Sequence, residues 1–235
     1  MTKNMIGWMI IDVPPEAKRA LSLHITNVIK RIDCSRFSQE PQYVAALFGR
    51  LDAMVYESAR FSLELRSTIV DDRGRGSAES NWGADFALVA SITQGSDSME
   101  KAVLGQAKRG SLTRLSPSGS EKFRIQAVKM SRATSDLIGL EVPTTNEVQP
   151  TVRIIDVPKL HGNIPIYSFD SFLLRHEHTI TASNAGPPVA LTKHIPLGQY
   201  IYARLLRCIH GDIRPNFVQA VSDSKLTKLT AIAHA

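Results

Sequence analysis

Cysteine is almost absent from this 235-residue chain. Its two cysteines, Cys34 and Cys208, lie far apart and have no neighbours at metal-ligand spacing, which excludes a disulfide framework and a structural zinc site. Long hydrophobic runs are also missing, because the apolar residues 5–13 are too few to span a bilayer and end at Pro14-Pro15 without a small-residue cleavage pattern. We therefore expect a cytoplasmic protein with no membrane association, in which residues 5–13 form a buried strand.

Low-complexity segments are missing as well, and hydrophobic residues make up 43% of the chain. This composition is typical of a globular protein, and 235 residues can bury one sizeable core with appendages. Lysine and arginine outnumber aspartate and glutamate by 28 to 22, which gives a formal net charge of +6. Such an excess favours polyanionic partners, although many proteins that bind no nucleic acid carry a similar charge.

Two amphipathic helices are predicted before the first strand of the core. Residues 16–32 place apolar side chains at helical spacing, with basic residues on the other face. The pattern is clearest over residues 40–55, where apolar positions from Val44 to Val55 follow the i, i+3, i+4, i+7 rule. Pro41 marks the beginning of this second helix, because a proline in the first turn costs no helical hydrogen bond.

Three strands are predicted next, at residues 60–70, 84–92 and 101–108, with turn-forming residues between them. We expect them to form a three-strand meander. Helical periodicity returns over residues 118–137, and a buried strand follows at residues 137–142. A strand, crossover helix, strand unit makes its two strands parallel, so the predicted fold class is α/β with a mixed sheet.

The pattern weakens beyond Pro143. We expect a strand at residues 152–157, a loop at residues 181–188 and a helix across residues 200–209. Residues 166–174 receive no assignment, and the chain has no internal repeat.

Three polar residues carry the strongest functional signal. Asp85 stands at the start of the second predicted strand, and Gln106 and Lys108 lie two apart in the third. Side chains two apart on a strand share a face, and an antiparallel neighbour can bring Asp85 beside them. Carboxylate and amide oxygens suit Mg²⁺, while an ammonium can position water or offset developing charge. The trio therefore suits hydrolysis of a phosphodiester bond.

The motif GAD at residues 83–85, followed one strand later by QAK at residues 106–108, resembles the PD-(D/E)xK nuclease superfamily. More narrowly, it resembles the QxK branch of Mrr-type restriction endonucleases and anti-phage effector nucleases. The order of helix, three strands, helix and strand is also that of the family's core. The resemblance implies a restriction-endonuclease-like core at residues 38–142, an N-terminal strand and helix at residues 1–37, and a C-terminal extension at residues 143–235 packed on the same domain.

The activity that this resemblance implies is Mg²⁺-dependent or Mn²⁺-dependent endonuclease cleavage of DNA. Asp85, Glu40 and Gln106 would hold the metal, and Lys108 would assist the attack of water. A defence effector of this kind would also have an activating protein partner or form a homo-oligomer.

The second metal carboxylate is the least determined part of the implied site. In the family a carboxylate on the helix before the meander often completes the site, and Glu40 occupies the matching place. Glu79 could approach from the loop before Asp85, whereas Glu57 would lie away from it. Gln106 replaces the family's commoner acid and removes one negative charge, a feature that the QxK branch shares.

Several residues are candidates for contacts with nucleic acid. The resemblance implies that Gln126, on the helix after the QAK strand, faces the site. Arg73 and Arg75, together with Arg109 and Arg114, could form a basic rim that neutralises phosphates. The turn that contains Arg73 is equally compatible with an ordinary hairpin loop.

Other interpretations stay open at this point. Asp85 could be a structural cap in a non-catalytic module that binds nucleic acid or protein with a nuclease-like fold. His176 and His178 would share a face of a strand, but no third ligand has recognisable spacing, so a metal pair there is disfavoured. His210 is interpreted as a residue of a helix C-terminal cap. Arg204 and Arg207 are expected on a solvated helix face.

Overall fold

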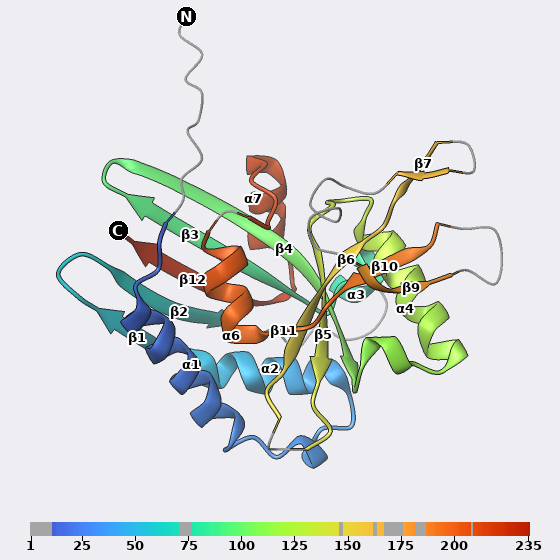
Figure 1. Cartoon of the computed structure of the whole chain (residues 1–235), viewed down its shortest axis with the longest axis horizontal. Coiled ribbons are helices and arrows are strands. Elements are labelled where there is room, and N and C mark those ends of the chain that lie inside the picture. Colours follow the sequence, from blue (N-terminus) through green and yellow to red (C-terminus); the bar gives the residue numbers. More distant parts are fainter. Residues whose placement is uncertain are drawn as a thin grey trace, which may run out of the picture.

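In the part of the chain that the structure describes, ten strands join in one mixed sheet. Figure 1 shows how the strands and helices are arranged. The computed structural model describes residues 11–70, 77–145, 148–161, 164–166, 176–181, 187–207 and 209–235. The sheet strands are β1 (Met54–Glu57), β2 (Ser62–Thr68), β3 (Phe86–Gln94), β4 (Asp97–Arg109), β5 (Leu137–Val142), β6 (Thr151–Asp156), β9 (His176–Ile180), β10 (Val189–Thr192), β11 (Ile195–Pro196) and β12 (Thr227–His234). Their order is β1-β2-β12-β3-β4-β5-β6-β10-β9, with β11 paired to β6. The α/β class with a mixed sheet is confirmed.

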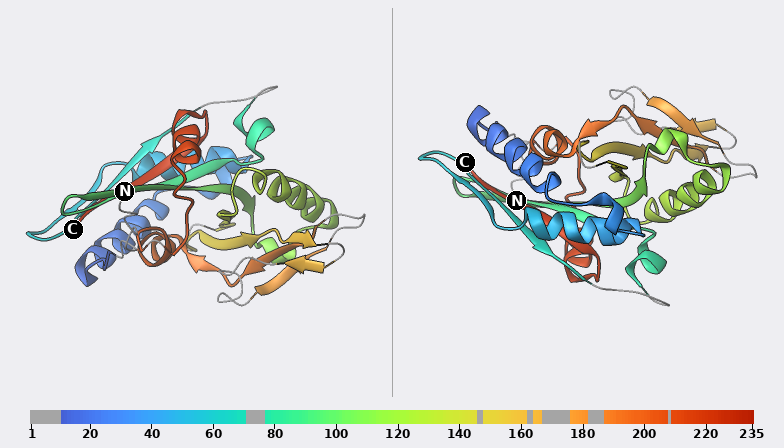
Figure 2. Two further views of the ribbon diagram at one scale, coloured as in Figure 1. Left: turned by 90° about the horizontal axis from the view of Figure 1, so that it is seen from above. Right: turned by 90° about the horizontal axis from the view of Figure 1, so that it is seen from below.

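Helices lie on both faces of this sheet. They are α1 (Pro15–Ile29), α2 (Glu40–Leu51), α3 (Ala78–Trp82), α4 (Pro117–Met130), α6 (Leu197–Tyr200) and α7 (Pro215–Asp223). Shorter helical turns are η1 (Cys34–Arg36), η2 (Leu112–Arg114) and the wide π-helical turn η3 (Ile201–Leu205), and a separate hairpin joins β7 (Lys159–His161) to β8 (Ile164–Ile166). Figure 2 shows α1 and α7 on opposite sides of the sheet.

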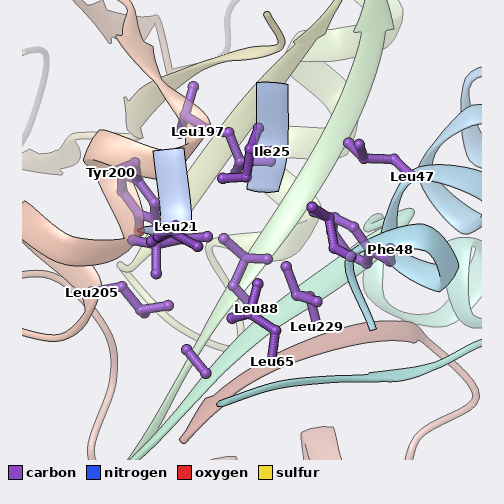
Figure 3. Close-up of a cluster of buried hydrophobic side chains, with 14 of the residues drawn as sticks. Leu21, Ile25, Leu47, Phe48, Leu65, Leu88, Leu197, Tyr200, Leu205 and Leu229 are labelled. Carbon is purple, nitrogen blue, oxygen red and sulfur yellow. The ribbon is translucent and has the colours of Figure 1, made fainter. Parts of the chain in front are cut away.

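Each face of the sheet has its own hydrophobic core. The larger core lies under α1, α2 and α6, and Figure 3 shows Leu21, Phe48, Leu88 and Leu205 converging there from helices and strands. The smaller core lies under α4 and α7 and includes Phe123. Both helices predicted at the start of the chain bury the apolar faces that defined them, as α1 and α2.

The second predicted helix is shorter than expected. Helix α2 ends at Leu51, and Ala53 takes a positive φ of 60° before the chain enters β1 at Met54. The prediction that the helix continues to Val55 is therefore wrong. Met54 fits a helical repeat, but it adopts a strand conformation because it pairs with Leu65 of β2. The spacing of apolar residues along the chain does not predict such a pairing.

The predicted three-strand meander is also wrong in one respect. Strand β12 lies between β2 and β3, antiparallel to β2 and parallel to β3. The first and second predicted strands are therefore not neighbours. The pairing of β3 with β4 is antiparallel as expected, and α4 connects β4 to the parallel strand β5 as predicted. Residues 227–234 thus belong to the middle of the sheet.

Of the remaining predicted elements, some agree with the structure and others lie outside the described residues. Residues 152–157 correspond to β6, and the helix expected at residues 200–209 corresponds to the end of α6 and η3. Residues 5–10 of the predicted N-terminal strand, and most of residues 166–174 and 181–188, lie outside the described residues, while residues 11–13 form no strand. Within the described part of the chain, no helix is long and apolar enough to cross a membrane.

Gly105 allows the tight packing of β3 on β4 beside the functional residues. It lies opposite Phe86, and a Cβ added to Gly105 would come within 2.2 Å of the Phe86 ring. That ring packs edge-on against Phe48 of α2, with ring centroids 5.5 Å apart, so it has little room to move. The absence of a side chain at Gly105 lets the core close over the hairpin.

Replacing Gly105 with alanine should therefore destabilise the fold by about 1–3 kcal/mol, because the new methyl group overpacks the core. The free energy of unfolding in urea is the measurement. Gly49→Ala is the matched control, since a Cβ there meets only Ile69 at 3.7 Å and alanine favours a helix. An equal effect of the two substitutions would contradict the packing argument.

Candidate active site

Asp85 and Gln106 are in direct contact at the shared end of β3 and β4. Asp85 lies immediately before β3, and its main-chain N–H donates to the Gly105 carbonyl at 2.9 Å. Its carboxylate oxygen Oδ2 accepts hydrogen bonds from Gln106 Nε2 at 2.5 Å and from Ala107 N at 2.9 Å. The carboxylate is therefore fixed against β4, as the alternation of strand side chains predicted.

Gly83 brings the chain into this position. Its φ of 76° suits glycine, and a Cβ at Gly83 would lie 2.8 Å from the main-chain oxygen of Gln126 in α4. Helix α4 therefore packs directly on the turn that leads into Asp85. This places the main chain of Gln126, a half-buried residue, next to the turn before Asp85.

Gln106 is buried, with only 1% of its surface exposed. Its Nε2 donates to Asp85, but its Oε1 is buried and has no hydrogen-bond partner among the described residues. A buried polar oxygen without a partner costs about 1–3 kcal/mol. The side-chain amide is thus held by one end only.

Lys108 follows on the same face of β4 and is half-buried. Its neighbour on β5 in the parallel register is Glu141. Within the described ranges, Lys108 forms no ion pair or side-chain hydrogen bond, which leaves its ammonium available to a ligand.

Glu40 reaches the same end of β4 but by a different route. It begins α2, and its Oε1 accepts a hydrogen bond from Arg109 N at 3.3 Å. Helix α2 packs on the sheet face that carries Ala107, whereas Gln106 and Lys108 point to the α4 face. Glu40 therefore meets the strand one residue after Lys108, from the opposite face.

Neither Glu57 nor Glu79 is seen near Asp85 among the described residues. Glu57 ends β1, which β2 and β12 separate from β3, so it lies away from Asp85 as expected. Glu79 lies in α3, and its side chain is outside the described part of the structure. Among the described residues, no three histidine, cysteine, aspartate or glutamate side chains lie close enough together to hold a metal ion.

A buried ion pair supports the loop that follows Lys108. Glu141 and Arg153 are 8% and 3% exposed, and Arg153 Nε donates to Glu141 Oε1 at 2.7 Å. The same oxygen accepts from Leu112 N at 2.8 Å and Ser111 Oγ at 3.0 Å, so it anchors the turn at the exit of β4. Burial by itself raises the pKa of Glu141, but hydrogen bonds from Thr151, Arg153 and Leu112 outweigh it and lower the pKa.

Sequence reasoning missed this pair, although it left a signal. Glu141 is the only charged residue of β5, and Arg153 is the only basic residue of β6. An acid in one buried strand and a base in the next are best satisfied when the two charges meet. Such a pattern predicts an ion pair between the strands.

The residues proposed for nucleic-acid contacts have mixed positions. Arg109 is exposed to solvent. Its guanidinium donates to the Phe37 carbonyl and thereby holds the segment before α2. Arg114 is exposed in η2, near the exit of β4. Arg73 and Arg75 lie outside the described residues.

Among the described residues, the histidines are not grouped with other ligands into a metal site. His178 is half-buried in β9, and the side chain of His176 lies outside the described part. The main-chain N–H of His210 donates to Arg204 O at 3.3 Å, consistent with the expected helix cap. Its ring is buried, however, with Nδ1 2.6 Å from Tyr200 Oη and Nε2 3.7 Å from Asp136.

Comparison with known proteins supplies no relative for this chain. No protein-family model matches it, and no curated protein or solved structure matches it significantly.

Proposed function

We propose that this protein is a metal-dependent nuclease that hydrolyses phosphodiester bonds of DNA at the shared end of β3 and β4. The observation that carries the proposal is the Asp85 carboxylate held on Gln106 and Ala107, with Lys108 next on the same face of β4. The order α2, β2, β3, β4, α4 and β5 supports a restriction-endonuclease-like core, with β12 as an additional strand between β2 and β3.

The unpartnered oxygen of Gln106 supports a cation at this place. Half a rotation of the side-chain amide would turn Oε1 toward Asp85, and two oxygens facing each other are stable only with a cation between them. Asp85 and Gln106 would then hold Mg²⁺ or Mn²⁺, while water and substrate phosphate complete the shell, an arrangement common for Mg²⁺. When bound, the ion polarises the phosphate and lowers the pKa of coordinated water.

Glu40 is the second carboxylate in this proposal. Its hydrogen bond to Arg109 N is long, at 3.3 Å, so little is lost when the carboxylate turns to another partner. It contacts the strand at Arg109 N, one residue after Lys108, and would turn around this strand end from the α2 face to reach the ion. The charge of Glu40 would compensate for the neutral Gln106, which contributes no charge to the site.

Lys108 supplies the positive charge of the reaction. Its ammonium lies on the same face as Gln106 and can orient a water molecule or stabilise the charge that develops on the phosphate oxygens. The Glu141 anchor holds the loop after Lys108 and so limits the movement of this strand end. Arg114, exposed in that loop region, can neutralise a neighbouring phosphate of the substrate.

Metal binding gives the direct test. Calorimetric titration of Mn²⁺ should show a binding event that Asp85→Asn weakens by about tenfold or more, because the variant loses the carboxylate that Gln106 and Ala107 hold at the site. Glu57→Gln is the matched control and should bind Mn²⁺ like the wild type. In parallel, the wild type should cleave plasmid DNA in Mg²⁺ and stop when EDTA is added, and a single-stranded RNA substrate tests the choice of nucleic acid.

A second candidate function is a module that binds nucleic acid without cleaving it. The bond between Glu40 and Arg109 N favours it, because a committed Glu40 would leave Asp85 without a second carboxylate. Unchanged Mn²⁺ affinity in Asp85→Asn, together with retained DNA binding, would support this module and contradict the nuclease.

A further inference from the structure

A pocket of about 440 Å³ lies between the β10–β11 connection and the helical segment that contains η3. Its polar lining includes Thr192, Lys193, His194, Gln199, Arg204 and Arg207. A volume of this size is typical of sites for small molecules. The pocket is formed by other residues than Asp85, Gln106 and Lys108.

The lining carries positive charge and no carboxylate. Lys193, Arg204 and Arg207 all contribute to it, and within the described residues none of the three forms an ion pair. Glu177 is an acid near this region, but its carboxylate is hydrogen-bonded to Arg153, which is the main reason that its pKa is lowered, with smaller effects from His194 and Lys193. Three cations that line one concave surface repel each other unless an anion lies between them.

A hydrogen bond from Arg153 determines which ring nitrogen of His194 carries the proton. Its Nδ1 lies 3.3 Å from Arg153 Nη2. Arginine has only donors, so Nδ1 must accept this bond and the proton of the neutral ring is on Nε2. His194 thus adds an N–H donor to a pocket that already contains two guanidinium groups and an ammonium.

The backbone of the helical wall is unusual at the same place. Leu206 N donates to Ile201 O at 2.9 Å and Ile209 N donates to Arg204 O at 3.2 Å, both with the i to i+5 spacing of a π-helix. Such wide turns are rare and occur frequently at functional sites. Here the wide turn carries Arg204 and leads into Arg207, which the sequence alone placed on an ordinary solvated face.

We propose that this pocket binds a small phosphorylated molecule, with its phosphate oxygens contacting Arg204, Arg207 and Lys193. Guanidinium groups match phosphate oxygens through paired hydrogen bonds, and the pocket volume leaves room for an attached body of nucleoside size. The phosphate could belong to a free nucleotide or to a DNA strand.

Calorimetric titration with inorganic pyrophosphate, and then with ADP, tests the proposal on the full chain. The wild type should bind both, and Arg204→Gln/Arg207→Gln should weaken binding by about tenfold or more, since hydrogen bonds to charged groups are lost. The control Arg50→Gln/Arg132→Gln removes two exposed arginines from other surfaces and should bind like the wild type. Arg204→Lys/Arg207→Lys keeps the charge and tests the paired geometry if the glutamine variant folds poorly.

Three results would overturn the proposal. One is the absence of pyrophosphate and ADP binding to the wild type at millimolar concentration. Another is an equal loss of affinity in the pocket variant and the control, which would indicate general surface charge. The third is selective loss of affinity for a short DNA duplex in the pocket variant with unchanged pyrophosphate binding, which would assign these arginines to the DNA surface. None of these depends on nuclease activity.

Discussion

Replacing Lys108 with alanine is expected to slow metal-dependent cleavage of DNA by about a hundredfold to a thousandfold. Lys108 is half-buried on the face of β4 that carries Gln106, and charge acts more strongly in such a place than in water. Its effect grows as negative charge develops on the phosphate, so kcat should fall while KM changes little. A time course of plasmid nicking in Mg²⁺ measures the rate.

Two further variants make this result specific. Lys30→Ala removes an exposed lysine at the end of α1 and should leave the rate unchanged. Lys108→Arg keeps the charge but changes its geometry, so partial activity is expected. Equal cleavage by Lys108→Ala and the wild type would remove Lys108 from the proposed mechanism. Its Mn²⁺ affinity should stay within a few-fold of wild type, because Lys108 is not a proposed ligand.

Glu141→Gln should destabilise the fold by about 3–5 kcal/mol, because it removes the buried carboxylate partner of the Arg153 guanidinium and leaves only the half-exposed Glu177. Ser111 Oγ and Leu112 N both donate to Glu141 Oε1, so in the variant they would donate to a neutral amide oxygen in place of a charged one. The free energy of unfolding in urea measures the effect. Glu121→Gln breaks a partly exposed pair with Arg124 on α4 and should cost less than about 1 kcal/mol.

The same ion pair determines how stability responds to acid. The pKa of Glu141 is lower in the folded chain than its ordinary value of 4.5, so its charge stabilises the fold fully above that pH. This contribution is lost as the pH falls through the lower, folded value. Unfolding curves between neutral and acid pH should therefore show a smaller loss of stability for Glu141→Gln than for the wild type. An identical pH dependence would contradict the role of this carboxylate.

Sequence periodicity correctly predicted the elements whose structure depends on residues nearby in the sequence. Helices α1 and α4 show their apolar faces within a few turns, and the β3–β4 hairpin has its turn in the chain between the strands. The place of β12 could not be predicted in this way. Its partners in β2 and β3 are distant in sequence, and an apolar strand carries no mark of which strands it will join.

The sequence likewise predicted one contact of the candidate site but not the others. The approach of Asp85 to Gln106 follows from alternation on two paired strands, so sequence spacing predicted it. The hydrogen bond of Glu40 to Arg109 N depends on how α2 lies across the sheet, which spacing does not determine. Arg204 appeared solvated because an ordinary helix was assumed, whereas the π-helical turn makes it part of a pocket wall.

The central position of β12 makes residues 227–234 a condition for a formed sheet. Val70 and Thr227, which are hydrogen-bonded at one end of this pairing, lie 157 residues apart. A fragment without residues 227–234 would expose the edges of β2 and β3, and β3 is the strand that positions Asp85. Contacts of such long range form slowly during folding. A polypeptide that stops before residue 227 would thus lack the strand that supports β3 and, through it, the position of Asp85.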